Sequence, residues 1–213
     1  MKKIDIIKSY DNIAEDYAKK YCNELQDKPF DCMVLEKYAT SVKEGGVICD
    51  VGCGPGHIAT YLSKYNLRVV GVDLSESMLK IFNRINPGLE YAKGEIGGLP
   101  FLDNSFDGIV AFYSLIHIER RNVICALQDM ARVLKADGVI LLAFHMGNTD
   151  HSCNNWFGKK VSIDITNYEI EEMARYLRQA GFEIESVNQR EPYKKIELSS
   201  QRGFVQARKL NSA

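Results

Sequence analysis

Residues 50–56 read Asp-Val-Gly-Cys-Gly-Pro-Gly, which places three glycines and a proline directly after an apolar run and an aspartate. Glycine allows backbone conformations that other residues avoid, and it lets a ligand approach the main chain closely. A glycine-rich turn of this kind, between a strand and a helix, is where a parallel sheet binds its ligand. Asp73 follows about 20 positions after the glycines, where a carboxylate can accept the hydroxyls of a ribose. These residues predict a site for a ligand that contains a nucleoside.

Two classes of ligand share these features. A dinucleotide-binding enzyme has glycines in the order Gly-x-Gly-x-x-Gly and holds a pyrophosphate at the N-terminus of the helix. Here the order is Gly-x-Gly-x-Gly, from Gly52 to Gly56, and Asp50 precedes the first glycine by two positions. A carboxylate there repels a pyrophosphate but suits the cationic amino group of an amino acid. An NAD-dependent oxidoreductase is therefore the alternative function, and a ligand with an amino acid group is favoured.

The elements that must position these residues alternate along the chain. Short apolar runs predict strands at residues 47–51, 68–73, 89–92, 106–113 and 139–144. Apolar residues three or four apart predict a helix at 124–134, and residues 135–138 are expected to end it. Strands that alternate with helices form an α/β fold with a doubly wound, mostly parallel sheet.

The C-terminal part has a different pattern. After a helix around residues 170–180, apolar and polar residues alternate at 181–188 and again at 203–208. Alternation with a period of two is typical of strands with one exposed face. We expect an antiparallel hairpin at an edge of the sheet. The connection between its strands, residues 189–201, is long, and loops of that length are often functional.

Composition limits the class of partner. The chain has 213 residues, of which 46% are hydrophobic, and its 27 Lys and Arg nearly balance its 28 Asp and Glu. A single domain over residues 1–213 is expected, and nucleic acid is disfavoured as a partner because it requires a basic surface. No apolar run reaches the roughly 20 residues that span a bilayer, and the first residues lack the apolar stretch of a signal peptide. We expect a cytoplasmic protein without a membrane partner. The six cysteines have no metal-binding spacing, so no metal site is expected.

Four motifs in register resemble those of class I S-adenosylmethionine-dependent methyltransferases. Residues 50–56 are similar to the first motif, 71–79 to the second, 93–107 to the third, and 132–138 to the segment before the fifth strand. The likeness covers roughly residues 10–145 and is to the small-molecule branch, similar to ubiquinone/menaquinone methyltransferases. It implies S-adenosylmethionine as cofactor, a small-molecule methyl acceptor, and a seven-stranded, Rossmann-like sheet. A non-catalytic module that binds the same cofactor is a further alternative.

The resemblance also implies roles for individual residues. The loop around Asp50 would hold the methionine moiety, and Asp73 the ribose hydroxyls. Glu95 stands where many relatives carry an aspartate that faces the adenine amino group. The residues implied to bind the cofactor are Tyr17, Asp50, Gly52, Cys53, Gly54, Gly56, Asp73, Leu74, Met78, Glu95, Ile96 and Tyr113.

Methyl transfer is a displacement, so alignment in a dry pocket supplies much of the rate enhancement. A base is needed only where the acceptor still holds its proton. The candidates lie past the fourth and fifth predicted strands: Tyr113, His117 and His145. Histidine suits general-base catalysis near neutral pH.

The chain divides into three expected parts: an N-terminal helical lid at 1–44, a cofactor-binding core at 45–146, and an acceptor-side segment with a helix and the terminal hairpin at 147–213. In the lid, five residues with helical spacing either pack into the core or face the cofactor, Tyr17 among them; they are Tyr10, Ile13, Ala14, Tyr17 and Tyr21. Aromatic residues expected near the acceptor are Trp156, Phe157, Tyr168 and Tyr193.

Overall fold

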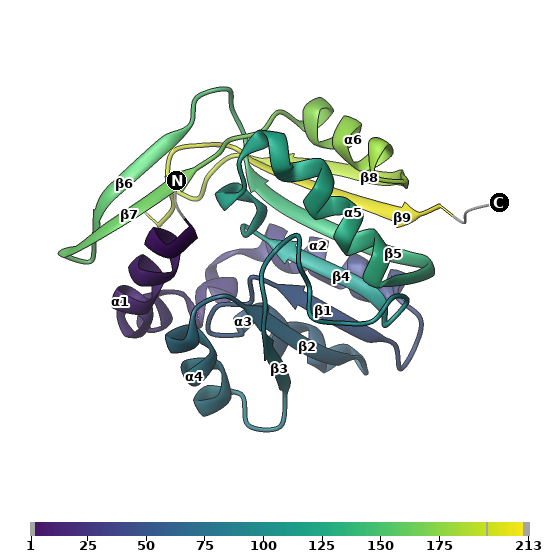
Figure 1. Cartoon of the computed structure of the whole chain (residues 1–213), viewed down its shortest axis with the longest axis horizontal. Helices are drawn as coiled ribbons and strands as arrows, with labels where there is room; N and C mark the ends of the chain where they lie inside the picture. Colours follow the sequence, from purple (N-terminus) through teal and green to yellow (C-terminus); the bar gives the residue numbers. More distant parts are fainter. Residues whose placement is uncertain (1–2, 195, 211–213) are drawn as a thin grey trace.

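A computed structural model describes residues 3–194 and 196–210 (Figure 1). Within this part of the chain, a central sheet has seven strands in the order β3-β2-β1-β4-β5-β9-β8. The strands are β1 (Val47–Val51), β2 (Arg68–Asp73), β3 (Glu90–Lys93), β4 (Phe106–Phe112), β5 (Leu134–His145), β8 (Phe182–Arg190) and β9 (Arg202–Lys209). The first five pair in parallel, and β9 pairs antiparallel with both β5 and β8. The predicted α/β fold with a C-terminal hairpin is confirmed.

Helices cover both faces of this sheet. They are α1 (Lys3–Tyr21), α2 (Pro29–Ser41), α3 (His57–Leu62), α4 (Glu76–Ile85), α5 (Val123–Val133) and α6 (Ile170–Gln179). Short 3-10 helices connect them: η1 (Glu24–Asp27), η2 (Ser63–Tyr65), η3 (Leu115–His117) and η4 (Arg120–Asn122). Along β4, Ile109 and Ala111 pack on the side of α5 and α6, whereas Val110 and Phe112 pack on the side of α2 and α3. Burial on both faces explains why the central strands are largely apolar.

Two details of the sheet differ from the sequence prediction. Residues 135–138 do not separate helix from strand, because α5 ends at Val133 and β5 begins at Leu134, which pairs with Phe106 before a register shift. β9 is also not an edge strand, since it lies between β5 and β8. Its polar Gln206 is accordingly buried, and hydrogen bonds donated to Glu185 and Ser41 satisfy its side-chain amide.

A second, two-stranded antiparallel sheet was not predicted. It consists of β6 (His151–Trp156) and β7 (Lys159–Ile165), and it lies beside α1 at one end of the molecule (Figure 1). The Ser162 backbone N–H donates to Ser9 Oγ at 2.8 Å, and Lys159 Nζ lies 2.8 Å from Asp16 Oδ2. The Trp156 ring packs against Tyr17, with 5.6 Å between ring centroids. The hairpin and α1 therefore form one packed unit.

The expected domain limits at residues 1 and 213 lie outside the described residues. The division into lid, core and acceptor-side segment stays a prediction. Among residues 3–194 and 196–210, no helix is both long and apolar enough to cross a bilayer.

Candidate active site

The turn after β1 is built from glycine backbone and one carboxylate. Gly52, Gly54 and Gly56 have φ angles of 76°, 52° and 89°, in the left-handed region that favours glycine. Asp73, at the end of β2, accepts hydrogen bonds from the Gly54 N–H and the Ser75 N–H, each at 2.8 Å. Asp73 thereby fixes the glycine turn, a role that the spacing of the residues did not reveal.

A cavity of about 1130 Å³ opens at the carboxyl ends of the parallel strands. This is where an open α/β sheet binds its ligand, and the volume suits a nucleoside-sized molecule. Its lining includes every residue implied to bind the cofactor except one: Tyr17, Asp50, Gly52, Cys53, Gly54, Asp73, Leu74, Met78, Glu95, Ile96 and Tyr113. The exception is Gly56, where a Cβ atom would lie 2.5 Å from Phe82 Cδ2, so this glycine serves close packing against α4.

Asp50 is the most unusual group in the cavity wall. Its side chain is 1% exposed, and its Oδ2 atom has no hydrogen-bond partner among the described residues. Burial raises its pKa to about 7; the neighbouring His57 and a backbone hydrogen bond from Ala59 oppose this shift, and Asp73 adds to it. A buried carboxylate is costly unless it is paired. Among the described residues, no donor reaches Oδ2, and the ammonium group of an amino acid would supply one.

Tyr10 and His117 meet in the wall of the same cavity, from α1 and η3. The Tyr10 hydroxyl lies 2.7 Å from His117 Nε2, and His117 Nδ1 lies 3.0 Å from the carbonyl oxygen of Asp164. Because a carbonyl oxygen can only accept, Nδ1 carries the hydrogen and Nε2 accepts from Tyr10. Burial lowers the pKa of His117 and raises that of Tyr10, so both groups are neutral near pH 7.

The other two predicted catalytic residues are placed differently. Tyr113 lines the cavity with a φ of 58°, and its hydroxyl donates to Asp31 at 3.2 Å. His145 is not among the lining residues; its ring lies behind that of Tyr113, and its Nδ1 is 2.8 Å from Ser200 Oγ. Burial, with the nearby positive charge of Arg202, lowers the pKa of His145 to about 3. Catalytic roles for Tyr113, His117 and His145 stay predictions; of the two histidines, only His117 lines the cavity.

None of the four aromatic residues expected near the acceptor lines the cavity. Tyr168 is fully buried and donates its hydroxyl to the carbonyl of Ile118 at 2.9 Å, and Tyr193 accepts from the Phe30 N–H at 3.0 Å. Tyr168 and Tyr193 therefore hold separate segments of the chain together by hydrogen bonds. The lining instead includes polar residues that the sequence analysis did not single out, and these are Arg120, Arg121, Asn122, Asp150, Ser152 and Thr166.

In the α1 helix, the predicted aromatic stripe serves two purposes. Ile13 and Ala14 are buried in the core, whereas Tyr10 and Tyr17 line the cavity. The stripe therefore packs into the core through some residues and lines the cavity through others, and contact of Tyr17 with the cofactor stays a prediction.

Comparison with known proteins agrees with this arrangement. Residues 48–138 match the family described as "Methyltransferase domain". A demethylmenaquinone methyltransferase of Renibacterium salmoninarum is 30% identical over 152 residues, which are 67% of this chain and 62% of that enzyme. An uncharacterised protein of Methanocaldococcus jannaschii is 27% identical over 85% of this chain and 78% of its own length.

Solved structures share the fold. An S-adenosylmethionine-dependent methyltransferase from Methanosarcina mazei superimposes with a TM-score of 0.74 at 19% identity, covering 84% of this chain and 98% of that one. A second, from Mesorhizobium loti, gives a TM-score of 0.66 at 20% identity over 83% and 96% of the two chains. The chain therefore contains a methyltransferase domain at residues 48–138 and has the fold of S-adenosylmethionine-dependent methyltransferases.

Proposed function

We propose that this protein transfers a methyl group from S-adenosylmethionine to a small polar molecule. The observation that carries the proposal is the buried Asp50 carboxyl beside the glycine turn, whose Oδ2 has no hydrogen-bond partner among the described residues. The ammonium group of the cofactor's methionine moiety would neutralise this carboxylate.

The residues of the cavity have separate tasks in this proposal. When bound, S-adenosylmethionine would supply a methyl group whose bond to a positively charged sulfur breaks as a nucleophile attacks the methyl carbon, with the sulfur as leaving group. Asp50 would hold the amino acid end, Asp73 the ribose, and Met78 the adenine. Tyr10 and Tyr17, from α1, line the cavity. They would exclude water from a bound cofactor, which would strengthen the electrostatic interactions inside.

The hydrogen-bonded pair of Tyr10 and His117 gives the cavity a proton acceptor. The Tyr10 oxygen can take a proton from the nucleophilic atom of the acceptor while its own hydrogen passes to His117 Nε2. His117 then carries the positive charge, and its Nδ1–H remains bonded to the Asp164 carbonyl. This arrangement suits an acceptor that loses a proton when it is methylated.

The polar part of the lining supports the choice of acceptor. Asn122, Asp150, Ser152 and Thr166 come from η4 and from residues in and around the β6–β7 hairpin. An acceptor with several hydrogen-bonding groups fits these side chains better than a purely apolar molecule does. Demethylmenaquinone is the second candidate acceptor, because relatives of 30–35% identity bear its name.

A transfer assay with a labelled methyl donor tests the proposal. The protein is incubated with the small-molecule fraction of a cell extract and, in parallel, with demethylmenaquinone in detergent micelles. Label in a water-soluble product, lost in the Asp73→Ala variant, is the expected result. Label only in the solvent-extractable quinone indicates the second candidate. Tight binding of S-adenosylhomocysteine without transfer to any acceptor favours a non-catalytic module.

A further inference from the structure

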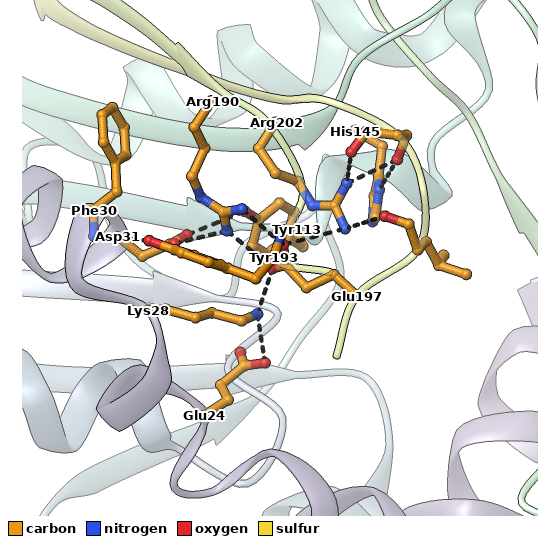
Figure 2. Close-up of polar contacts among 12 residues, drawn as sticks. Glu24, Lys28, Phe30, Asp31, Tyr113, His145, Arg190, Tyr193, Glu197 and Arg202 are labelled. Carbon is orange, nitrogen blue, oxygen red and sulfur yellow. Dashed lines mark hydrogen bonds and ion pairs between the residues drawn. The ribbon is translucent and has the colours of Figure 1, made fainter. Parts of the chain in front are cut away.

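The long connection between β8 and β9 folds against the start of α2 and buries several charged side chains there (Figure 2). Arg190, Glu197 and Arg202 come from this connection and the strand ends beside it, and Lys28 and Asp31 come from the start of α2. None of the five side chains is more than 7% exposed. Segments more than a hundred residues apart in the sequence are therefore joined by buried ion pairs.

Glu197 is the centre of this cluster. Its carboxylate lies 2.8 Å from Lys28 Nζ, 2.7 and 2.9 Å from the two terminal nitrogens of Arg190, and 3.8 Å from Arg202 Nη2. It also accepts the backbone N–H of Tyr193 at 2.8 Å. Burial alone would raise the pKa of Glu197, but the hydrogen bonds from Arg190 and Lys28 hold it well below its usual range, so the carboxylate is charged.

One branch of contacts runs from Glu197 towards the glycine turn. Lys28 Nζ lies 2.8 Å from Glu24 Oε2, and Glu24 Oε1 lies 3.1 Å from His57 Nε2. His57 is the first residue of α3 and lines the cavity. Glu197 itself does not line the cavity.

A second branch runs from Glu197 to the opposite wall. Arg190, which pairs with Glu197, lies with Nη2 2.7 Å from Asp31 Oδ2. Asp31 accepts the hydroxyl of Tyr113, which lines the cavity. Figure 2 shows Tyr113 beside these groups, with Asp31 and Arg190 on one side and Arg202 and His145 on the other. The two branches thus connect a single carboxylate to two walls of the cavity.

Both branches pass through residues 24–31, the segment that follows α1 and leads into the core. α1 contributes Tyr10 and Tyr17 to the cavity wall. Because the segment directly follows α1, its position constrains where the C-terminal end of α1 lies. Buried ion pairs are weak as a source of stability, since apolar residues of similar volume often stabilise as well. What a fully paired cluster provides is a defined geometry.

We propose that Glu197 is a positioning residue that holds the segment 24–31, and with it the α1 helix, in the form of the cavity that binds ligand. The inference rests on the proposed function, because part of its effect is measured as affinity for a product of the cofactor.

The test compares the Glu197→Gln and Glu191→Gln variants. Gln at 197 keeps the size of the side chain but removes the charge, whereas Glu191 is an exposed residue of the same connection. We expect Glu197→Gln to bind S-adenosylhomocysteine about tenfold or more weakly, mainly through faster dissociation, and Glu191→Gln to bind it as the unmodified protein does.

The fluorescence of Trp156 gives a readout that does not depend on ligand. It is the only tryptophan of the chain, and its ring packs against Tyr17 and Tyr21 of α1. Circular dichroism first identifies a temperature at which Glu197→Gln is folded. If Trp156 of this variant then emits at longer wavelength than in the unmodified protein, α1 packs less tightly against the β6–β7 hairpin. Should that variant not fold, Lys28→Met breaks only the branch towards His57 and is expected to shift both readouts in the same direction.

Unchanged affinity and unchanged Trp156 emission in Glu197→Gln would overturn the inference. Failure of the unmodified protein to bind S-adenosylhomocysteine would instead overturn the proposed function. In that case the Trp156 emission still decides whether Glu197 positions α1.

Discussion

The pH dependence of ligand binding gives a sharp prediction for Asp50. In the unliganded protein its carboxyl has a pKa of about 7, mainly because it is buried. The proposed partner is an ammonium group, which requires the carboxylate form. Below the pKa, the fraction of protein with an ionised Asp50, which is the form that binds the ligand, falls by a factor of ten for each pH unit. Affinity for S-adenosylhomocysteine is therefore expected to rise about tenfold, or about 1.4 kcal/mol, between about pH 6 and pH 7.5.

Calorimetric titration in two buffers of different ionisation enthalpy measures this directly. Below pH 7, binding should release about one proton, from Asp50. The binding heats in the two buffers should therefore differ by about the difference between their ionisation enthalpies. The Asp50→Asn variant is the control, and it should bind more weakly with little dependence on pH. Affinity that stays constant over the range, or the same pH dependence in Asp50→Asn, would refute the reasoning.

Three further results are expected. Gly52→Ala should abolish binding of S-adenosylhomocysteine and lower the free energy of unfolding by roughly 2 kcal/mol or more. The reason is that its Cβ would lie 2.3 Å from the Ser114 Cβ. Gly88→Ala is the control: its Cβ would meet nothing within 4 Å, and binding should be unchanged. Tyr10→Phe should reduce methyl transfer by about a hundredfold or more and change binding little. Nitrogen-15 NMR should still find His117 as the Nδ1–H tautomer. A transfer rate equal to that of the unmodified protein would exclude the proton-accepting pair. Asp50→Asn should raise the melting temperature of the unliganded protein above pH 7. Because the pKa of Asp50 is raised in the folded protein, stability is lost as pH rises from the unfolded pKa to about 7, and asparagine does not ionise. An unchanged or lower melting temperature would contradict the raised pKa.

The sequence was most informative where local chemistry determines structure. The glycine turn and Asp73 could be located because turn geometry and the ends of parallel strands leave a pattern within about 25 residues. The β6–β7 hairpin left no such pattern, since β6 reads His-Ser-Cys-Asn-Asn-Trp and lacks the β-branched residues typical of strands. It is stabilised by pairing with β7 and by packing on α1, which are tertiary effects.

The polar partners in the cavity wall depend on long-range contacts. Tyr10 and His117 are separated by 107 positions, so no spacing rule could pair them. The same holds for His145, which does not line the cavity and whose partner Ser200 lies 55 positions away in the connection between β8 and β9. Residue type alone made these histidines equal candidates, and only the fold distinguishes them.

Calorimetric titration with S-adenosylhomocysteine and with NAD tests the central claim most directly. Asp73 is the residue to vary, because it fixes Gly54 and is the group proposed to bind the ribose. The account predicts binding of S-adenosylhomocysteine at roughly micromolar affinity or tighter, its loss in Asp73→Ala, and no binding of NAD. Binding of NAD, or no binding of S-adenosylhomocysteine by a folded protein, would contradict it.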